Sequence, residues 1–447
     1  MRQLAGTRTR YRRAHATPLA GLISGRAKYT STVRQSIPAA ENRQAVEVHL
    51  RQKDLQMNIM TQSCRLKQRL RSAVALVLLA QSPSLLQASD VADVKQPCSA
   101  VKSGPVVWDG ELVFAVTAPA QTKLLRVWVP IPPSDTVQDV RLTDLTTFPV
   151  DVKPQLGTEG VFGNTFAYFE FQNPLGAIII RHRLKVQTHE LHWNLDAAQV
   201  QTPASWRDEF NPYLRSEQQA VVTDARFGSL LTEILPQRRN PLLDLDAVMT
   251  FADRNFTYDH RNASLKASSL HAIEQRSGHC SDYHGFCAAM GRVMSLPTRV
   301  TYGLNPFPKA SPSHCKLETF LPPYGWVSFD VSETQKLMNT IRADAALSDA
   351  QKVALVDAAH ARLIGGFRDN TWILQTRGTD YDLMPRASAK VAVVRTLYAE
   401  ADGVPLPDPD PSNSEETRFA WMTAHRFTSD VAAPYAYKNA GSLTAKD

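Results

Sequence analysis

Short apolar runs separated by turn residues dominate the chain between residues 112 and 188. Leu124–Pro130, Phe166–Phe171 and Ile178–Val186 are rich in β-branched and aromatic residues, and Asn173-Pro174 supplies a turn between the last two. Runs of this length without helical periodicity predict an all-β sandwich. No cluster of ionisable residues here indicates chemistry, so we interpret the region as a structural or substrate-positioning module.

Helical periodicity begins after about residue 205. Leu243, Ala247, Val248 and Phe251 fall on one face of a predicted helix. A second helix has a much wider apolar stripe, made of Tyr283, Phe286, Cys287, Met290, Val293 and Met294. A stripe this wide predicts a helix that is buried centrally, and Pro297 ends it.

A hairpin is predicted directly after this helix. Ser313–Leu321 and Trp326–Val331 flank the sequence Pro-Pro-Tyr-Gly, which is a strong turn signal. A turn at this point places Asp330 roughly opposite Lys316, and therefore diagonally next to His314. After about residue 348 the pattern predicts an amphipathic helix followed by further strand-like segments.

The net charge of +7 is unevenly distributed. Residues 1–88 hold 15 of the 50 basic residues and 3 of the 43 acidic ones, which leaves 35 basic and 40 acidic residues in the rest. The body is therefore slightly acidic and lacks the basic character of a nucleic-acid-binding protein. Its 43% apolar and 21% charged residues are typical of soluble globular proteins, and 447 residues suffice for two or three domains.

The leader contains an export signal. A segment that begins at Met60 carries four basic side chains, then the apolar run Ala73–Ala80, and ends at Leu86-Gln87-Ala88, which fits a cleavage site. The run is too short to span a bilayer, so we expect a cleaved signal and a periplasmic or extracellular mature chain. We interpret residues 1–56 as the result of a start codon assigned too early, with a transit peptide as the alternative.

Export places four cysteines in an oxidising compartment, and their irregular spacing does not indicate a disulfide framework. They are Cys98, Cys280, Cys287 and Cys315. Cys280 begins the buried helix, where unpaired backbone N–H groups and the helix dipole favour a thiolate and can hold an oxyanion. A lone Cys is also often a small buried residue, and position alone leaves both interpretations open.

The hairpin supplies the partners that a nucleophilic thiol needs. A carboxylate at Asp330 can accept the N–H of His314, which fixes the tautomer of the ring and supports its positive charge. If the start of the buried helix packs against this hairpin, His314 reaches Cys280 as a base. The three residues then form a nucleophile, a base and an orienting acid.

These segments resemble the catalytic core of the transglutaminase-like cysteine enzymes. The matching segments are Gly278–Tyr283, Leu296–Val300, His314–Glu318 and Tyr324–Asp330. Their order and spacing are those of the family. The resemblance implies a papain-like core in which Cys280, His314 and Asp330 are catalytic, with no metal and no organic cofactor.

Weaker similarity covers most of residues 110–405 and points to the secreted bacterial branch, which has a β-sandwich in front of the core. We therefore expect an α+β fold. After a leader and signal peptide (1–88), it comprises an Ig-like β-sandwich (98–200), a papain-like transglutaminase-type core (201–345) and a C-terminal extension packed on the core (346–447).

One position departs from the family. Members commonly have an aromatic residue two positions after the catalytic His, and this chain has Lys316 there. We expect this cation to alter substrate preference or, at worst, to depress the pKa of His314. It removes no member of the triad.

Other candidate residues are less informative. Histidines at 271, 279 and 284 surround Cys280, but no second paired cluster completes four ligands with a familiar spacing, so we expect no metal site. We expect Cys287 and Cys315 to be packing residues. The pairing of Cys98 stays open. Gln275 is a candidate oxyanion donor, although a surface role is the simpler interpretation.

The resemblance implies thiol-dependent acyl transfer on peptide or carboxamide bonds. With water as acceptor the protein is a cysteine protease, peptidase or amidase, and we prefer this interpretation. With a lysine amine as acceptor it is a crosslinking transglutaminase. The alternative from another class is a non-catalytic binding module on the same fold. We expect a protein or peptide substrate, no nucleic acid and no stable membrane span after signal cleavage.

Overall fold

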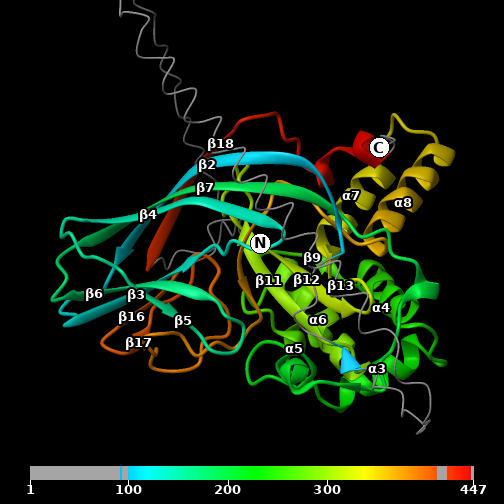
Figure 1. The fold of residues 1–447 in the computed structure, drawn as a ribbon, viewed down its shortest axis with the longest axis horizontal. Helices are drawn as coiled ribbons and strands as arrows, with labels where there is room; N and C mark the ends of the chain where they lie inside the picture. The colour runs from blue at the N-terminus through cyan, green and yellow to red at the C-terminus, as the bar shows by residue number, and fades with distance from the viewer. Residues whose placement is uncertain (1–90, 93–98, 410–419, 444–447) are drawn as a thin grey trace, which may run out of the picture. The chain divides into compact units, whose positions relative to one another are not determined.

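The computed structural model describes residues 91–92, 99–409 and 420–443 (Figure 1). The predicted leader and signal peptide and Cys98 lie outside the described residues. In the described part of the chain, no helix is long and apolar enough to cross a membrane. The short strand β1 (Val91–Ala92) pairs in parallel with β8 (Ser205–Trp206).

Two five-stranded antiparallel sheets share one hydrophobic core, as Figure 1 shows. The first contains β14 (Phe367–Arg368), β7 (Ala177–His192), β2 (Val101–Thr117) and β18 (Trp421–Ser429), with β4 (Gln138–Phe148) also paired to β7. The second contains β17 (Val404–Pro405), β16 (Tyr398–Ala401), β3 (Leu124–Ile131), β6 (Thr165–Gln172) and β5 (Gln155–Thr158).

Strict alternation along the strands builds this core. On β2, Leu112, Phe114 and Val116 are fully buried, and the residues between them are more exposed. Ile178 and Ile180 of β7 join the same cluster. Side chains that alternate in this way turn one face of a strand to the core and the other to solvent. The Ig-like description of the sandwich stays a prediction.

Apart from these two sheets, an antiparallel sheet belongs to the core that follows the sandwich. Its strand order is β13 (Gly325–Phe329), β12 (Ser313–Leu321), β11 (Thr298–Leu304) and β15 (Ile373–Arg377). The helix α6 (Cys280–Val293) packs on β12 and β11. The other helices are α2 (Asn211–Leu214), α3 (Ala225–Ile234), α4 (Pro241–Asn255), α5 (Ser269–Gln275), α7 (Val331–Ala343) and α8 (Asp349–Ile364). The mixed α+β class predicted from the sequence is confirmed.

The helix predicted to be central is buried on all sides. Every residue of α6 from Cys280 to Arg292 is buried, and the ring of Phe286 packs between α3, α4 and the loop that carries Phe256. Because the apolar stripe is wide, the helix can bury contacts with the sheet and with the neighbouring helices together. α6 is therefore a rigid support for whatever lies at its first turn.

The C-terminal part of the chain contributes strands both to the sandwich and to the sheet of the core. Strand β15 joins the sheet of the core, whereas β16 pairs with β3 and β18 pairs with β2 in the sandwich. After β18 the chain forms two short 3₁₀ turns, η3 (Ala436–Lys438) and η4 (Ala440–Leu443), of which η3 contacts α7. Two further 3₁₀ turns, η1 (Ala197–Gln199) and η2 (Asp208–Phe210), lie between the sandwich and the first core helices in sequence. The predicted domain boundaries stay a prediction.

Candidate active site

Cys280 is the first residue of α6, and a glycine two positions earlier makes this helix start possible. β9 (Thr257–Tyr258) pairs with β10 (Ser277–Gly278), and Gly278 has φ +147°. A Cβ at Gly278 would lie 2.3 Å from Oδ2 of Asp282. That carboxylate accepts the backbone N–H of His279 at 3.1 Å and closes a capping box. The loop and the helix are thus locked together directly before the thiol.

His314 and Asp330 meet on the adjacent hairpin. His314 lies near the start of β12, and Asp330 follows β13 and caps α7 by accepting the N–H of Glu333 at 3.2 Å. Nε2 of His314 lies 2.7 Å from Oδ2 of Asp330. Leu317 pairs with Phe329, so the register continues to Lys316 opposite Asp330, as the turn predicts. Both side chains are almost fully buried.

The structure brings Cys280 to His314 as the sequence predicts. The two side chains line the same cavity, and the Cys280 thiolate acts on the charge of the His314 ring. Burial opposes the charge on the ring, but the Asp330 carboxylate and the Cys280 thiolate outweigh it and raise the pKa of His314 to about 9. Although burial also opposes the charge on Asp330, His314 and Lys316 hold the pKa of that carboxyl well below its usual value. The arrangement favours a thiolate–imidazolium pair with a carboxylate behind it.

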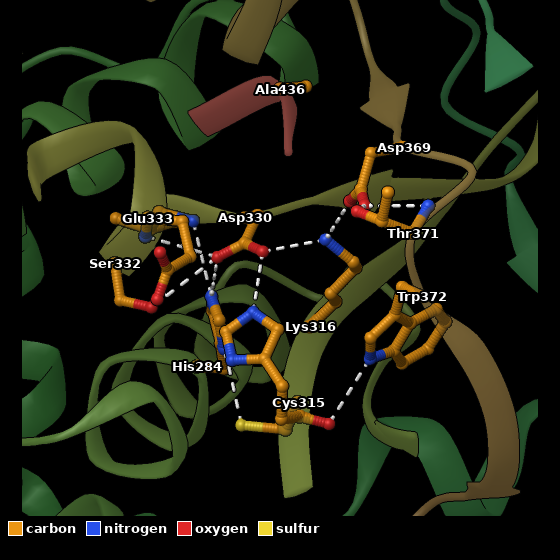
Figure 2. Close-up of polar contacts among 12 residues, drawn as sticks. His284, Cys315, Lys316, Asp330, Ser332, Glu333, Asp369, Thr371, Trp372 and Ala436 are labelled. Atoms are coloured by element: carbon orange, nitrogen blue, oxygen red, sulfur yellow. Dashed lines mark hydrogen bonds and ion pairs between the residues drawn. The ribbon is translucent and has the colours of Figure 1, made fainter. Parts of the chain in front are cut away.

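A chain of hydrogen bonds reaches Cys280 from the other side. Nε2 of His284 accepts the N–H of Val331 at 3.1 Å, and burial lowers the pKa of His284 to about 4, so the ring is neutral and its proton is on Nδ1. Nδ1 lies 3.4 Å from Sγ of Cys315 (Figure 2). Because this ring nitrogen is a donor, the Cys315 thiol keeps its own proton to donate toward Cys280, and it lowers the pKa of Cys280.

This thiol donor is the largest influence on the nucleophile. The hydrogen bond from Cys315 lowers the pKa of Cys280; burial opposes it, and the charge of His314 acts with it, so that the pKa lies well below its usual value. Cys315 is fully buried in the core, in agreement with the predicted packing role, and it also lies 3.4 Å from His284. Cys287 is also fully buried in the core, and burial alone raises the pKa of its thiol to about 12.

Lys316 does not point to substrate but is buried behind the triad. Its Nζ lies 2.6 Å from Oδ2 of Asp330 and 3.0 Å from Oδ2 of Asp369, as Figure 2 shows. Burial opposes its charge, but the two carboxylates raise the pKa of Lys316 above its usual value. The expected depression of the pKa of His314 does not occur, because Asp330 and the Cys280 thiolate outweigh it. Lys316 therefore helps to hold the carboxylate of Asp330 in place.

An open cavity of about 290 Å³ lies over the thiol. Cys280 and His314 line it, together with Tyr258, Tyr302 and several cationic side chains. Tyr258 and Cys280 lie on the same wall of the cavity. Gln275, in contrast, is exposed at the end of α5 and does not line the cavity. Among the described residues, no group of three or more His, Cys, Asp or Glu is arranged to hold a metal ion.

Several residues of the site were not identified from the sequence. Asp369 lies 53 positions beyond Lys316, and nothing in the local pattern links the two. His284 was considered only as a metal ligand, although its place one turn after Cys280 signals a side chain on the same face of the helix. No recognisable sequence motif marks Tyr258 as a residue of the site.

Comparisons with known proteins agree with this architecture. The family model of the core of the transglutaminase-like superfamily matches residues 229–331, which include Cys280, His314 and Asp330. An uncharacterized protein of Haemophilus influenzae is 23% identical over 217 residues, which cover 43% of this chain and 57% of that protein. The chain thus spans little more than half of that relative.

Solved structures show more distant likeness. A candidate cysteine protease from Cytophaga hutchinsonii is 11% identical with a TM-score of 0.49, over 75% of this chain and 94% of that one. The periplasmic domain of TgpA from Pseudomonas aeruginosa is 17% identical with a TM-score of 0.27, over 53% of this chain and 90% of that one. Residues 229–331 of this chain are thus similar to the core of the transglutaminase-like superfamily.

Proposed function

We propose that the protein is a cysteine hydrolase that cleaves peptide or carboxamide bonds through an acyl-enzyme. The observation that carries the proposal is the placement of three buried groups, in which Cys280 and His314 line one cavity and His314 lies 2.7 Å from Asp330. The match of the core to the transglutaminase-like superfamily supports it. A thiolate with a charged imidazole beside it is the reactive form of a cysteine nucleophile.

The first half of the reaction forms a thioester. The Cys280 thiolate attacks the carbonyl carbon, and its oxygen becomes an oxyanion. The N–H of Cys280 and the hydroxyl of Tyr258, whose residues lie on the same wall of the cavity, are the donors for this charge. Because Nε2 of His314 is bound to Asp330, the other ring nitrogen faces the sulfur. His314 protonates the leaving amine, the C–N bond breaks, and the thioester remains.

The second half returns the enzyme. His314, now neutral, takes a proton from water, and the resulting hydroxide attacks the thioester carbon. The C–S bond breaks, the carboxylic acid leaves, and Cys280 and His314 regain the thiolate and the imidazolium. A lysine amine in place of water would give a crosslinked product instead, and no observation on this chain favours that acceptor.

Site-specific alkylation and a peptide assay test the proposal. We expect iodoacetamide to label Cys280 at neutral pH much faster than it labels a free thiol, and Cys280→Ala to abolish release of amine from a Gln-containing peptide. Mass spectrometry with and without an added primary amine identifies the acceptor. A Cys280 that reacts no faster than free cysteine would indicate the non-catalytic binding module, and a mass gain equal to the amine would indicate a crosslinking enzyme.

A further inference from the structure

The cavity over Cys280 contains more cationic than anionic groups. Four lysine and arginine side chains line it in addition to His314, and the one carboxylate on its wall is Glu333. Two of the cations are already engaged, because Lys336 lies 2.7 Å from Glu333 and Arg395 is bound to Asp408 at 2.8 and 2.9 Å. The other two are Lys309 and Lys438.

These two lysines have no carboxylate at ion-pair distance within residues 99–409 and 420–443. Lys309 lies on the loop between β11 and β12, and Lys438 lies on η3, so they approach the cavity from separate parts of the chain. Burial lowers the pKa of Lys309, and the Glu333 carboxylate and the Cys280 thiolate act in the opposite direction. The ammonium group is thus partly desolvated and close enough to the nucleophile to interact with it.

Two phenol hydroxyls in the same wall have no protein partner. Tyr302 and Tyr435 line the cavity, and their hydroxyls are buried and form no hydrogen bond with the described residues. A buried polar group without a partner is unfavourable, so such groups are rare unless something else binds them. Both are donors, as are the two lysines, and a carboxylate accepts from all of these.

We propose that this cavity is a carboxylate-binding subsite, in which Lys309, Lys438 and the hydroxyls of Tyr302 and Tyr435 hold an anionic group of the substrate beside the carbonyl that Cys280 attacks. The inference rests on the proposed function and names its substrate class. The substrate is an acidic peptide that carries a carboxylate next to the scissile bond, either on an Asp or Glu side chain or at a free C-terminus.

Charge discrimination at Cys280 tests the subsite without a known substrate. Iodoacetate and iodoacetamide alkylate sulfur at the same carbon, but only the first carries a carboxylate. The measured quantity is the rate of iodoacetate at Cys280 divided by the rate of iodoacetamide, determined on the full chain by peptide mass spectrometry at low salt. We expect this ratio to fall about three- to tenfold in the double variant Lys309→Gln, Lys438→Gln. Lys309→Arg retains the charge and should keep the ratio.

Two further variants separate the subsite from changes in folding. Tyr302→Phe removes only a hydroxyl without a protein partner and should also lower the ratio, whereas Lys123→Gln, on an exposed residue of the sandwich, should not change it. An unchanged ratio in the double variant, with rapid labelling retained, overturns the subsite alone. Slow labelling of wild-type Cys280 by both reagents would contradict the proposed function instead.

Peptide protection distinguishes the two sources of the carboxylate. Three peptides of equal length compete with iodoacetamide, one with an internal Glu and blocked ends, one with Gln and a free C-terminus, and one with Gln and blocked ends. Protection by the first supports an acidic side chain, and protection by the second supports a terminal carboxylate. Equal protection by all three, or by none, overturns the inference.

Discussion

The thiol of Cys280 is held between two hydrogen-bonding systems. On one side are His314 and Asp330, and on the other is the thiol of Cys315, which is oriented by the neutral ring of His284. A hydrogen bond to a charged group is worth roughly 1.5–3 kcal/mol. Cys315 is therefore a positioning residue that stabilises the thiolate without touching substrate.

Cys315→Ala tests this role. The variant loses the main group that lowers the pKa of Cys280, so the pH midpoint of alkylation should move upward and the rate at pH 6 should fall about tenfold. The control is Cys287→Ala, which removes a buried thiol two turns along α6. An equal shift of the midpoint in both variants would mean that general loosening of the helix is responsible.

The charged ring of His314 stabilises the folded protein, and this contribution is lost at alkaline pH. The pKa of the folded ring is raised to about 9 from the ordinary 6.5. Its contribution is therefore fully present below about pH 6.5 and is lost as the pH rises through about 9. We expect the difference in Tm between wild type and His314→Gln to narrow between pH 6 and pH 10. A constant difference would show that the charge on the ring does not matter.

At the level of elements, the site depends on where α6 begins. The positive φ of Gly278 and its close approach to Asp282 join β10 to the first turn of the helix. The pairing of β12 with β13 then places Asp330 opposite Lys316, within reach of His314. A shift of one residue in either element would turn these side chains to the wrong face.

Gly278→Ala should disturb both stability and reactivity. The new Cβ adds strain at φ +147° and meets Asp282 at 2.3 Å, so we expect a loss of about 2–4 kcal/mol and much slower alkylation of Cys280. Gly163→Ala is the matched control, because Gly163 also has a positive φ (+76°) but has no atoms within 4 Å of the added Cβ. Urea unfolding and alkylation rates check the result, and equal effects at both positions would contradict it.

At the level of the whole molecule, the last part of the chain closes the site from behind. Tyr437 on η3 is buried, and Lys316 Nζ lies 5.1 Å from the centre of its ring. The same turn contributes Lys438 to the cavity. Residues more than 100 positions beyond the hairpin therefore help to keep the pair of Lys316 and Asp330 away from water.

Tyr437→Ala should expose the pair of Lys316 and Asp330 to water. Loss of a buried ring costs roughly 3–5 kcal/mol, and water would then weaken the ion pair that supports Asp330. We expect a lower Tm and a slower alkylation of Cys280. In Tyr437→Phe the ring is retained, and both values should stay near those of wild type. A large fall in Tm without any change in alkylation would limit the role of η3 to stability.

Local sequence was sufficient to predict the helix and the hairpin, and the resemblance to a known family added the prediction that Cys280, His314 and Asp330 act together. The apolar stripe of α6, the turn after Leu321 and the alternation along β12 depend only on neighbours in the chain, and the pairing of Leu317 with Phe329 agrees with the register predicted from that turn. Periodicity and turn chemistry act over a few residues, which is why they can be read without the fold.

Only the tertiary structure decided what surrounds the triad. Asp369 reaches Lys316 from a distant segment, β16 and β18 join the sandwich, and Lys438 reaches the cavity from the C-terminal turn. Such contacts depend on how whole elements dock, and no local pattern records them. The sequence by itself predicted Cys280, His314 and Asp330 and their order along the chain, whereas docking of the elements decided which groups surround them and the charge of the cavity.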